Sequence, residues 1–153
     1  MKKGEPYTFS LPYAPEQVFE MIADIASYPD FLPWCTGARI RDQSSNIVTA
    51  DLIIGYGVVR ETFTSRVILT PHTSIHVDYV KGPMNHLETI WSFKSSEDGR
   101  STEIKLCVDF EFKNFLLRRL MTSVFDHAFA SLSEAFTERA HALYGANALL
   151  SMR

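Results

Sequence analysis

The side chains in this 153-residue chain that could bind a metal or attack a substrate are few and widely spaced. His72, His76 and His86 fall in a region with the two-residue alternation of β-strands, and they would have to converge to hold a metal ion. His76 falls on the polar side of its strand, so we expect no metal site. Cys35 and Cys107 show no metal-ligand spacing, and we interpret them as buried thiols.

A short run of charged residues offers a second kind of chemistry. Arg60, Glu61 and Arg66 fall on one predicted strand and could hold a ligand's carbonyl group at a pocket mouth, or form solvated or cross-strand ion pairs. Asp109 and Glu111 alternate with apolar residues and are expected to face water. The chain shows no nucleophile elbow, phosphate-binding glycine loop or acid–base pair, so we predict no enzymatic activity.

The segment Tyr28–Cys35 combines two prolines with four large apolar side chains. Because proline fixes φ and removes a backbone donor, the segment predicts a loop that ends the preceding helix. Its apolar side chains must be buried against the rest of the protein, a ligand or a membrane. Phe31, Leu32 and Trp34 are therefore candidates for a gate or membrane contact, with a structural plug as the alternative.

Composition predicts one domain: 46% of residues are hydrophobic, 22% are charged and the net charge is −3. Residues 1–112 carry ten cationic and fifteen acidic side chains, which argues against DNA or other broad nucleic-acid binding. No run approaches the ~18 apolar residues of a membrane-spanning helix. The first residues also lack the apolar stretch of a secretory signal. We expect a cytoplasmic protein, with peripheral contact to the inner membrane as a further expectation.

Hydrophobic periodicity predicts the elements that position these residues. Residues 7–11 predict a strand, and a helix of about three turns starts at Pro15. Its apolar face comprises Val18, Phe19, Ile22 and Ile25. From about residue 38 to 112 the period is two, with turn signals at 55–57, 81–83 and 97–100, so we predict an antiparallel sheet with one apolar face.

Residues 114–145 predict one long helix, with Asn114 as its N-cap and Gly145 as a left-handed terminator. Its apolar residues cover about half of its circumference, as expected for a helix laid in the hollow of a curved sheet. The predicted fold is α+β, with about six to seven antiparallel strands curved around this C-terminal helix. The space between the sheet and this helix is either an apolar cavity or a solid core of aromatic side chains.

These residues resemble a known family. Tyr28–Cys35, followed by Gly37 and Arg39, is similar to the signature of the ubiquinone-binding START-like proteins, in the polyketide cyclase/dehydrase group of the Bet v 1-like, helix-grip superfamily. The similarity continues over nearly the whole chain, in 63–66, 82–84, 91–93, 109–112 and 136–140. Two branches share these motifs. One comprises quinone chaperones that support respiration, to which Trp34 is closer, and the other is a toxin-like branch that blocks association of ribosomal subunits.

The resemblance implies a START-like lipid-binding domain over residues 1–145 and a flexible tail over 146–153. It implies that ubiquinone or a related isoprenoid is a bound ligand, not a catalytic cofactor, and that the chain is its carrier. A ribosome-binding toxin and a cyclase- or hydratase-like enzyme are the alternatives. The expected ligand-binding residues are Phe31, Leu32, Trp34, Phe63, Tyr79, Trp91, Phe93, Val108, Phe110, Phe112, Leu120, Val124, Phe125 and Phe129. Transient membrane contact is expected at Phe31, Trp34, Leu116, Leu117, Arg118 and Arg119. For the last four, the alternative is an ordinary helix start whose arginines point to water.

Overall fold

The fold is a seven-stranded antiparallel sheet with its helices on one face. The computed structural model describes residues 6–145, apart from the side chains of Tyr56 and Val124. The elements are β1 (Tyr7–Leu11), α1 (Pro15–Ala23), η1 (Ile25–Asp30), β2 (Cys35–Ser44), β3 (Ile47–Tyr56), β4 (Val59–Thr70), β5 (Ser74–Lys81), β6 (Met84–Ser95), β7 (Thr102–Phe112), α2 (Phe115–Ala140) and η2 (His141–Gly145). The predicted C-terminal tail, 146–153, lies outside the described residues.

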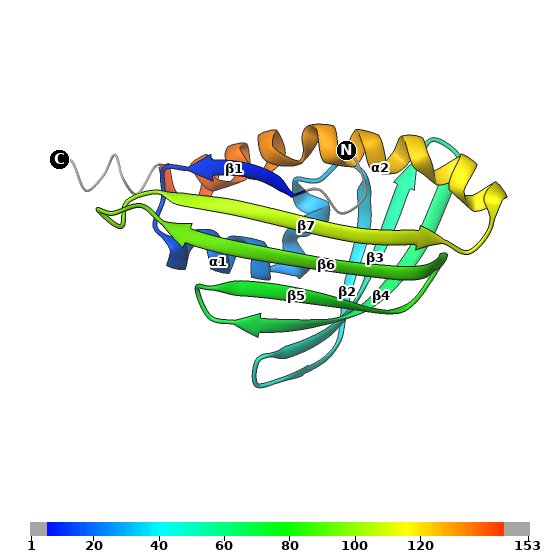
Figure 1. Cartoon of the computed structure of the whole chain (residues 1–153), viewed down its shortest axis with the longest axis horizontal. Coiled ribbons are helices and arrows are strands. Elements are labelled where there is room, and N and C mark those ends of the chain that lie inside the picture. The colour runs from blue at the N-terminus through cyan, green and yellow to red at the C-terminus, as the bar shows by residue number, and fades with distance from the viewer. Residues whose placement is uncertain (1–5, 146–153) are drawn as a thin grey trace.

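The strand order is β1-β7-β6-β5-β4-β3-β2, so consecutive strands pair along the chain except that β1 pairs with β7. In that pairing Tyr7 lies opposite Leu106. The sheet is strongly twisted, and β2, β3 and β4 cross steeply relative to β6 and β7 while α2 runs along the opposite side (Figure 1). The predicted α+β architecture, with six to seven strands and a long C-terminal helix, is confirmed.

The proline segment differs from its prediction. α1 ends at Ala23, and residues Ile25–Asp30 form a 3₁₀ helix that contains Pro29. A short 3₁₀ helix has few internal hydrogen bonds, so it tolerates the missing N–H of proline. The backbone then turns twice more, because the amides of Leu32 and Cys35 donate to the carbonyls of Tyr28 (2.9 Å) and Leu32 (3.0 Å). β2 therefore starts at Cys35, earlier than the predicted residue 38.

The long helix begins as predicted. The Asn114 side chain accepts a 2.8 Å hydrogen bond from the Leu117 amide, which satisfies one of the free donors of the first turn. The predicted left-handed end is wrong: Gly145 is absent from the residues with positive φ. The last five residues of the predicted helix, His141–Gly145, instead form a π-helical turn. This turn continues the right-handed course of the helix and needs no left-handed residue.

Two buried clusters fill the space between the helices and the sheet. The larger one lies around Val18, Ile22, Trp91 and Phe136, on α1, β6 and the C-terminal half of α2. The smaller cluster comprises Ile54, Phe63, Met84, Phe112 and Met121, with Trp34, Leu52, Val59, Tyr79, Leu87, Phe110, Leu117 and Phe125 packed against it. It lies toward the N-terminal end of α2.

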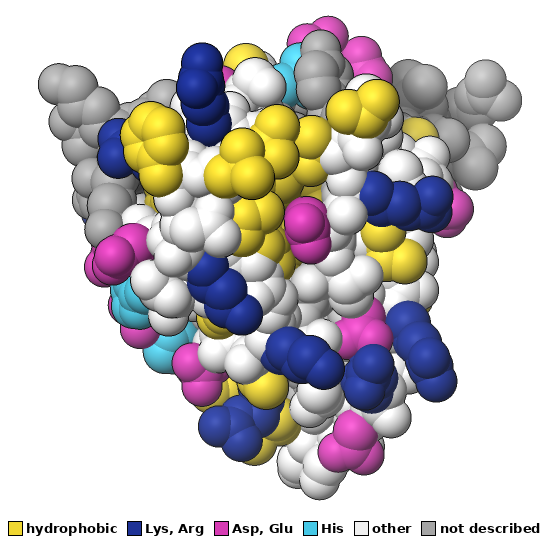
Figure 2. All heavy atoms as spheres, turned by 90° about the vertical axis from the view of Figure 1, so that its right-hand side faces the viewer, with side chains coloured by type: hydrophobic (Ala, Val, Ile, Leu, Met, Phe, Trp, Pro, Cys, Tyr) yellow, Lys and Arg dark blue, Asp and Glu magenta, His cyan; other side chains and the backbone are white. Residues whose placement is uncertain are grey.

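We call the end of the molecule beyond the smaller cluster the tip. It consists of the turn at 57–58, residues 80–83 and the segment 113–120. The Lys113 amide donates to the Pro83 carbonyl (3.2 Å) and holds two of these segments together. Gly82 has φ of 151°, and a Cβ there would lie 2.8 Å from the Thr62 carbonyl oxygen. Seen from this end, hydrophobic side chains gather between lysines and arginines (Figure 2).

Candidate functional site

A cavity of about 190 Å³ lies between the inner face of the sheet and the helices. Its wall comprises Ile22, Ile25, Tyr28, Trp34, Ala50, Leu52, Ile54, Phe63, Ser65, Val67, Ile75, Val77, Leu87, Thr89, Trp91, Leu106, Val108, Phe125, Ala128, Phe129 and Leu132. None of these side chains is charged, and only Ser65 and Thr89 are small polar residues. The chemistry of this wall therefore matches that of an apolar molecule.

Small side chains on facing elements create this empty space. Ala50 on β3 lies directly opposite Ser65 on β4, and Thr89 on β6 lies opposite Val108 on β7. Ala128 faces them from α2. The other lining side chains are mostly larger. The cavity therefore exists because the strand register places these small residues next to one another.

Two polar groups in the wall come from the 25–35 segment. The Tyr28 hydroxyl donates a hydrogen bond to the Ile22 carbonyl, and burial, with smaller contributions from Cys35 and Asp24, raises the pKa of Tyr28. Its proton is therefore held. The indole N–H of Trp34 is buried and has no acceptor among the described residues, which costs about 1–3 kcal/mol.

Six of the predicted ligand-binding residues line the cavity: Trp34, Phe63, Trp91, Val108, Phe125 and Phe129. Leu120 does not, because its side chain is exposed on the outer side of α2. Leu32 is fully buried in the larger cluster, and Phe93 packs edge-on against Phe19 (centroids 5.8 Å apart). The side chain of Val124 lies outside the described residues.

Phe110, Phe112 and Tyr79 form a layer between the cavity and the tip instead of its wall. The Phe125 ring is their centre, with centroids 5.4 Å from Phe110 and from Phe112 and 6.2 Å from Phe63. The aromatic side chains that sequence reasoning assigned to the cavity thus close one end of it.

Phe31 lies away from the cavity wall. Its ring is 5.3 Å from that of Phe136, and the Arg139 guanidinium stacks on it at 5.1 Å. Phe31 therefore lies beside the C-terminal part of α2, about 30 Å along the helix from Leu116. The two segments predicted to contact a membrane therefore lie toward opposite ends of α2. Leu117 also differs from its prediction, because its side chain turns inward against the smaller cluster.

Sequence reasoning missed most of the aliphatic and small residues of the wall. Val67, Ile75 and Leu106 have the inward parity that the alternation indicates, and they are buried. These residues were missed because the prediction selected mainly large aromatic side chains. Parity along each strand is the signal that could have found them, because it assigns small and large residues to the same face.

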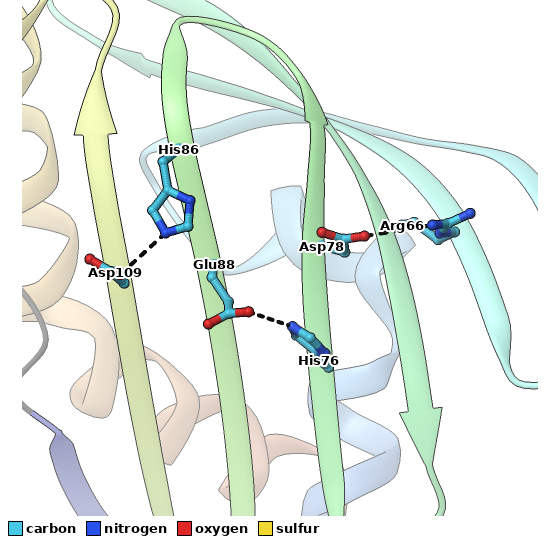
Figure 3. Close-up of polar contacts among 6 residues, drawn as sticks. All are labelled: Arg66, His76, Asp78, His86, Glu88 and Asp109. Carbon is cyan, nitrogen blue, oxygen red and sulfur yellow. Dashed lines mark hydrogen bonds and ion pairs between the residues drawn. The ribbon is translucent and has the colours of Figure 1, made fainter.

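The outer face of the sheet carries the charged residues (Figure 3). Arg66 pairs with Asp78 at 3.6 Å across β4 and β5. His76 contacts Glu88 and His86 contacts Asp109, each at 3.2 Å. The prediction that Arg66 forms an ion pair across strands is thus confirmed. Neither Arg60 nor Glu61 lines the cavity. Within residues 6–145 no group of three or more His, Cys, Asp or Glu could hold a metal ion.

Two further buried groups have structural partners. The Asp51 carboxylate accepts from Arg41 Nε and Thr64 Oγ1, both at 2.6 Å. Burial opposes ionisation of Asp51, but these hydrogen bonds and the positive charges of Arg41 and Arg39 outweigh it and lower its pKa. Burial raises the pKa of the Cys35 thiol to about 11, so it is not a nucleophile at neutral pH.

The twisted sheet, the long C-terminal helix and the apolar cavity between them define a START-like, helix-grip protein. The chain belongs to the family described as polyketide cyclase/dehydrase and lipid transport, whose model matches residues 11–137. In the described residues no helix is long and apolar enough to cross a membrane.

Relatives carry the names of both branches that the sequence resembles. The ribosome association toxin RatA of Pseudomonas aeruginosa is 31% identical over 135 residues, which is 88% of this chain and 93% of that protein. RatA of Escherichia coli is 36% identical over 139 residues, or 91% of this chain and 87% of that protein. The mitochondrial coenzyme Q-binding protein COQ10 homolog B of Xenopus laevis is 30% identical over 138 residues, or 88% of this chain and 57% of that protein.

Solved structures share the fold. The Zhui aromatase/cyclase from Streptomyces sp. R1128 superposes with a TM-score of 0.80 at 19% identity, over 91% of this chain and 93% of that one. An 18 kDa protein from Caulobacter crescentus gives a TM-score of 0.74 at 32% identity, over 94% and 99%. The first likeness concerns the fold alone, since identity is low.

Proposed function

We propose that this chain binds an isoprenoid quinone, or a lipid with a similarly flat carbonyl-bearing head, in the cavity under α2, and that it carries this ligand in support of respiration. The supporting observation is the cavity wall, which has no charged side chain. A prenylated quinone is apolar apart from its ring oxygens, so it matches such a wall. The name of the COQ10 relative agrees with this ligand class.

The size of the cavity limits how the ligand is held. At about 190 Å³ the cavity is smaller than the ~300–1,000 Å³ of pockets that enclose drug-sized ligands. A ring with its first prenyl unit is the part that fits most readily, and a long tail must leave the cavity or displace its wall. Each buried methylene contributes ~0.8 kcal/mol, so even one or two prenyl units give useful affinity.

Trp34 offers a hydrogen bond that this ligand can accept. Its indole N–H has no acceptor among the described residues, and its ring lines the cavity. We propose that a quinone oxygen accepts a hydrogen bond from this N–H. Where the ligand displaces the wall, recovering this unmade hydrogen bond would offset part of the cost of that movement.

Extraction of the purified protein with organic solvent, followed by mass spectrometry, tests this proposal. We expect a prenylated quinone in the extract and saturable binding of a short-chain ubiquinone added to the stripped protein. Trp34→Phe should weaken that binding about 2- to 12-fold, the value of one hydrogen bond. Trp91→Phe makes the same change elsewhere in the wall and is the control. Absence of quinone from the extract together with no binding of added quinone would refute the proposal.

Association with the ribosome is the second candidate, favoured by RatA relatives that match 87–93% of their own length. Sucrose-gradient sedimentation of ribosomal subunits with added protein tests it. A loss of joined ribosomes would favour this function, while unchanged profiles at saturating protein would exclude it. A catalytic role has less support, because none of the described residues that line the cavity is Asp, Glu, His, Lys or Arg.

A further inference from the structure

Five large hydrophobic side chains are exposed at the tip, beyond the aromatic layer that closes the cavity. Their exposed fractions are 101% for Val58, 73% for Phe115, 65% for Leu116, 59% for Val80 and 47% for Leu120. They come from three segments that are distant in sequence. The inward contacts of their neighbours Val59, Met84 and Leu117 in one cluster bring these segments together. Figure 2 shows the resulting patch from the side that would face a partner.

Charge distinguishes this end from the rest of the molecule. The three tip segments taken with their flanking residues, 56–62, 79–85 and 110–122, carry five cations, Arg60, Lys81, Lys113, Arg118 and Arg119, and two carboxylates, Glu61 and Glu111. All five cations are exposed. The remaining residues carry ten cations and sixteen carboxylates. The tip is therefore positive on a protein whose net charge is −3.

An apolar centre surrounded by cations is complementary to the surface of an anionic bilayer. Aliphatic and phenyl side chains can enter the acyl region while lysines and arginines stay with the lipid phosphates. RNA offers the same phosphate charge but no apolar layer for the exposed Val58, Leu116 and Leu120. A bilayer therefore accounts for both properties of the surface.

We propose that the tip is the surface by which this chain docks on anionic membranes, with Phe115, Leu116 and Leu120 inserted and Arg118 and Arg119 on the headgroups. The inference deepens the proposed function and rests on it for its purpose, since the cavity ligand would enter from the bilayer. Only the aromatic layer around Phe125 then separates the cavity from the membrane. A long prenyl tail could stay in the bilayer while the ring enters the cavity.

Flotation of the full chain with quinone-free vesicles tests the docking. We expect binding to phosphatidylcholine vesicles that contain phosphatidylglycerol, little binding to pure phosphatidylcholine, and loss of binding in high salt. Arg118→Gln with Arg119→Gln should weaken binding about 25-fold, since each cation is worth about 5-fold. The matched control removes two exposed cations on β6 and β7, Lys94→Gln with Lys105→Gln, and should bind as wild type.

The apolar contribution has its own variant. Leu116→Glu places a charge in the inserted group and should abolish flotation. Leu143→Glu makes the same change at an exposed leucine of η2, beyond the other end of α2, and should not. Circular dichroism checks that each variant is folded. Wild-type flotation by the Leu116→Glu variant or by the double-arginine variant would overturn the proposal.

The same variants also test two other partners for this surface, ribosomal RNA and a second copy of the chain. If vesicles bind no protein but ribosomes do, in a manner that needs Arg118 and Arg119, the tip is an RNA-binding surface and the membrane proposal is wrong. A dimer that Leu116→Glu dissociates, without vesicle binding, overturns it as well. Because the vesicles hold no quinone, docking succeeds or fails independently of the ligand. Tip variants should still bind a short-chain ubiquinone in solution if the proposed function is correct.

Discussion

Filling the cavity should separate stability from ligand binding. Ala128 lines the cavity from α2, whereas Ala130, two residues further along the same helix, is exposed. Ala128→Phe adds six carbon atoms to the cavity, and Ala130→Phe adds the same atoms to solvent. The pair therefore compares one substitution in two environments on one helix.

The magnitudes follow from the burial of the ring. Burying phenylalanine is worth ~1.5–3 kcal/mol, and overpacking costs ~1–3 kcal/mol. We therefore expect Ala128→Phe to change the free energy of unfolding by between about −1.5 and about +2 kcal/mol. For the ligand, the added ring occupies the room of about one five-carbon prenyl unit. Burial of that prenyl unit is worth ~4 kcal/mol, so the dissociation constant of the quinone should rise about 1,000-fold.

Urea unfolding followed by tryptophan fluorescence measures the stability, and quenching by a short-chain ubiquinone measures the binding. Ala130→Phe should bind as wild type and lose only about 0.5 kcal/mol of helix propensity. Equal quinone affinity in the two variants would show that the cavity is not the binding site. A destabilisation by Ala128→Phe of more than about 3 kcal/mol would contradict the empty space itself.

Three other predictions concern groups outside the cavity. Asp51→Asn should lower the free energy of unfolding by about 2 kcal/mol at pH 7, because its charge-assisted hydrogen bonds are lost. Because the pKa of Asp51 is lowered, this difference should be present above about pH 4 and shrink as the pH falls further. Denaturant curves at several pH values measure it. Iodoacetamide at pH 8 should label half-buried Cys107 before Cys35, whose pKa is raised to about 11, and peptide mass spectrometry should find both labelled only in denaturant. Gly82→Ala should destabilise by about 1–3 kcal/mol, because a Cβ meets backbone at 2.8 Å and φ is unfavourable; an unchanged melting temperature would contradict this.

The sequence predicted the strands well because their apolar residues alternate with polar ones. Ile104, Leu106 and Val108 on β7 are buried as the alternation indicates, and the turn at Gly99 has the expected positive φ. Helix boundaries were less predictable. Ile25 continues the apolar spacing of α1, yet it starts the 3₁₀ helix, because spacing does not distinguish four-residue from three-residue hydrogen bonding.

The cavity could be predicted only in outline. The sequence indicates which face of each strand is apolar, but the empty space depends on Ala50 lying opposite Ser65, and this pairing is a property of register. Phe110 and Phe112 have the correct parity and still miss the wall, since they extend past its end and pack around Phe125. Position along the strand, which periodicity leaves open, decides whether an inward side chain meets a ligand or another ring.

The pairing of β1 with β7 bears on the order in which the molecule assembles. The strands from β2 to β7 pair with their neighbours along the chain, so they can form through short loop closures. The N-terminal elements must instead find partners far along the chain: the Tyr7 hydroxyl donates to Ser133 and the Tyr144 hydroxyl to the Gln17 carbonyl, each at 2.8 Å. Contacts of such sequence separation are slow to form. Since α1 and η1 supply Ile22 and Ile25 to the wall, we expect a growing chain to become able to hold a ligand only after its last helix has been synthesised.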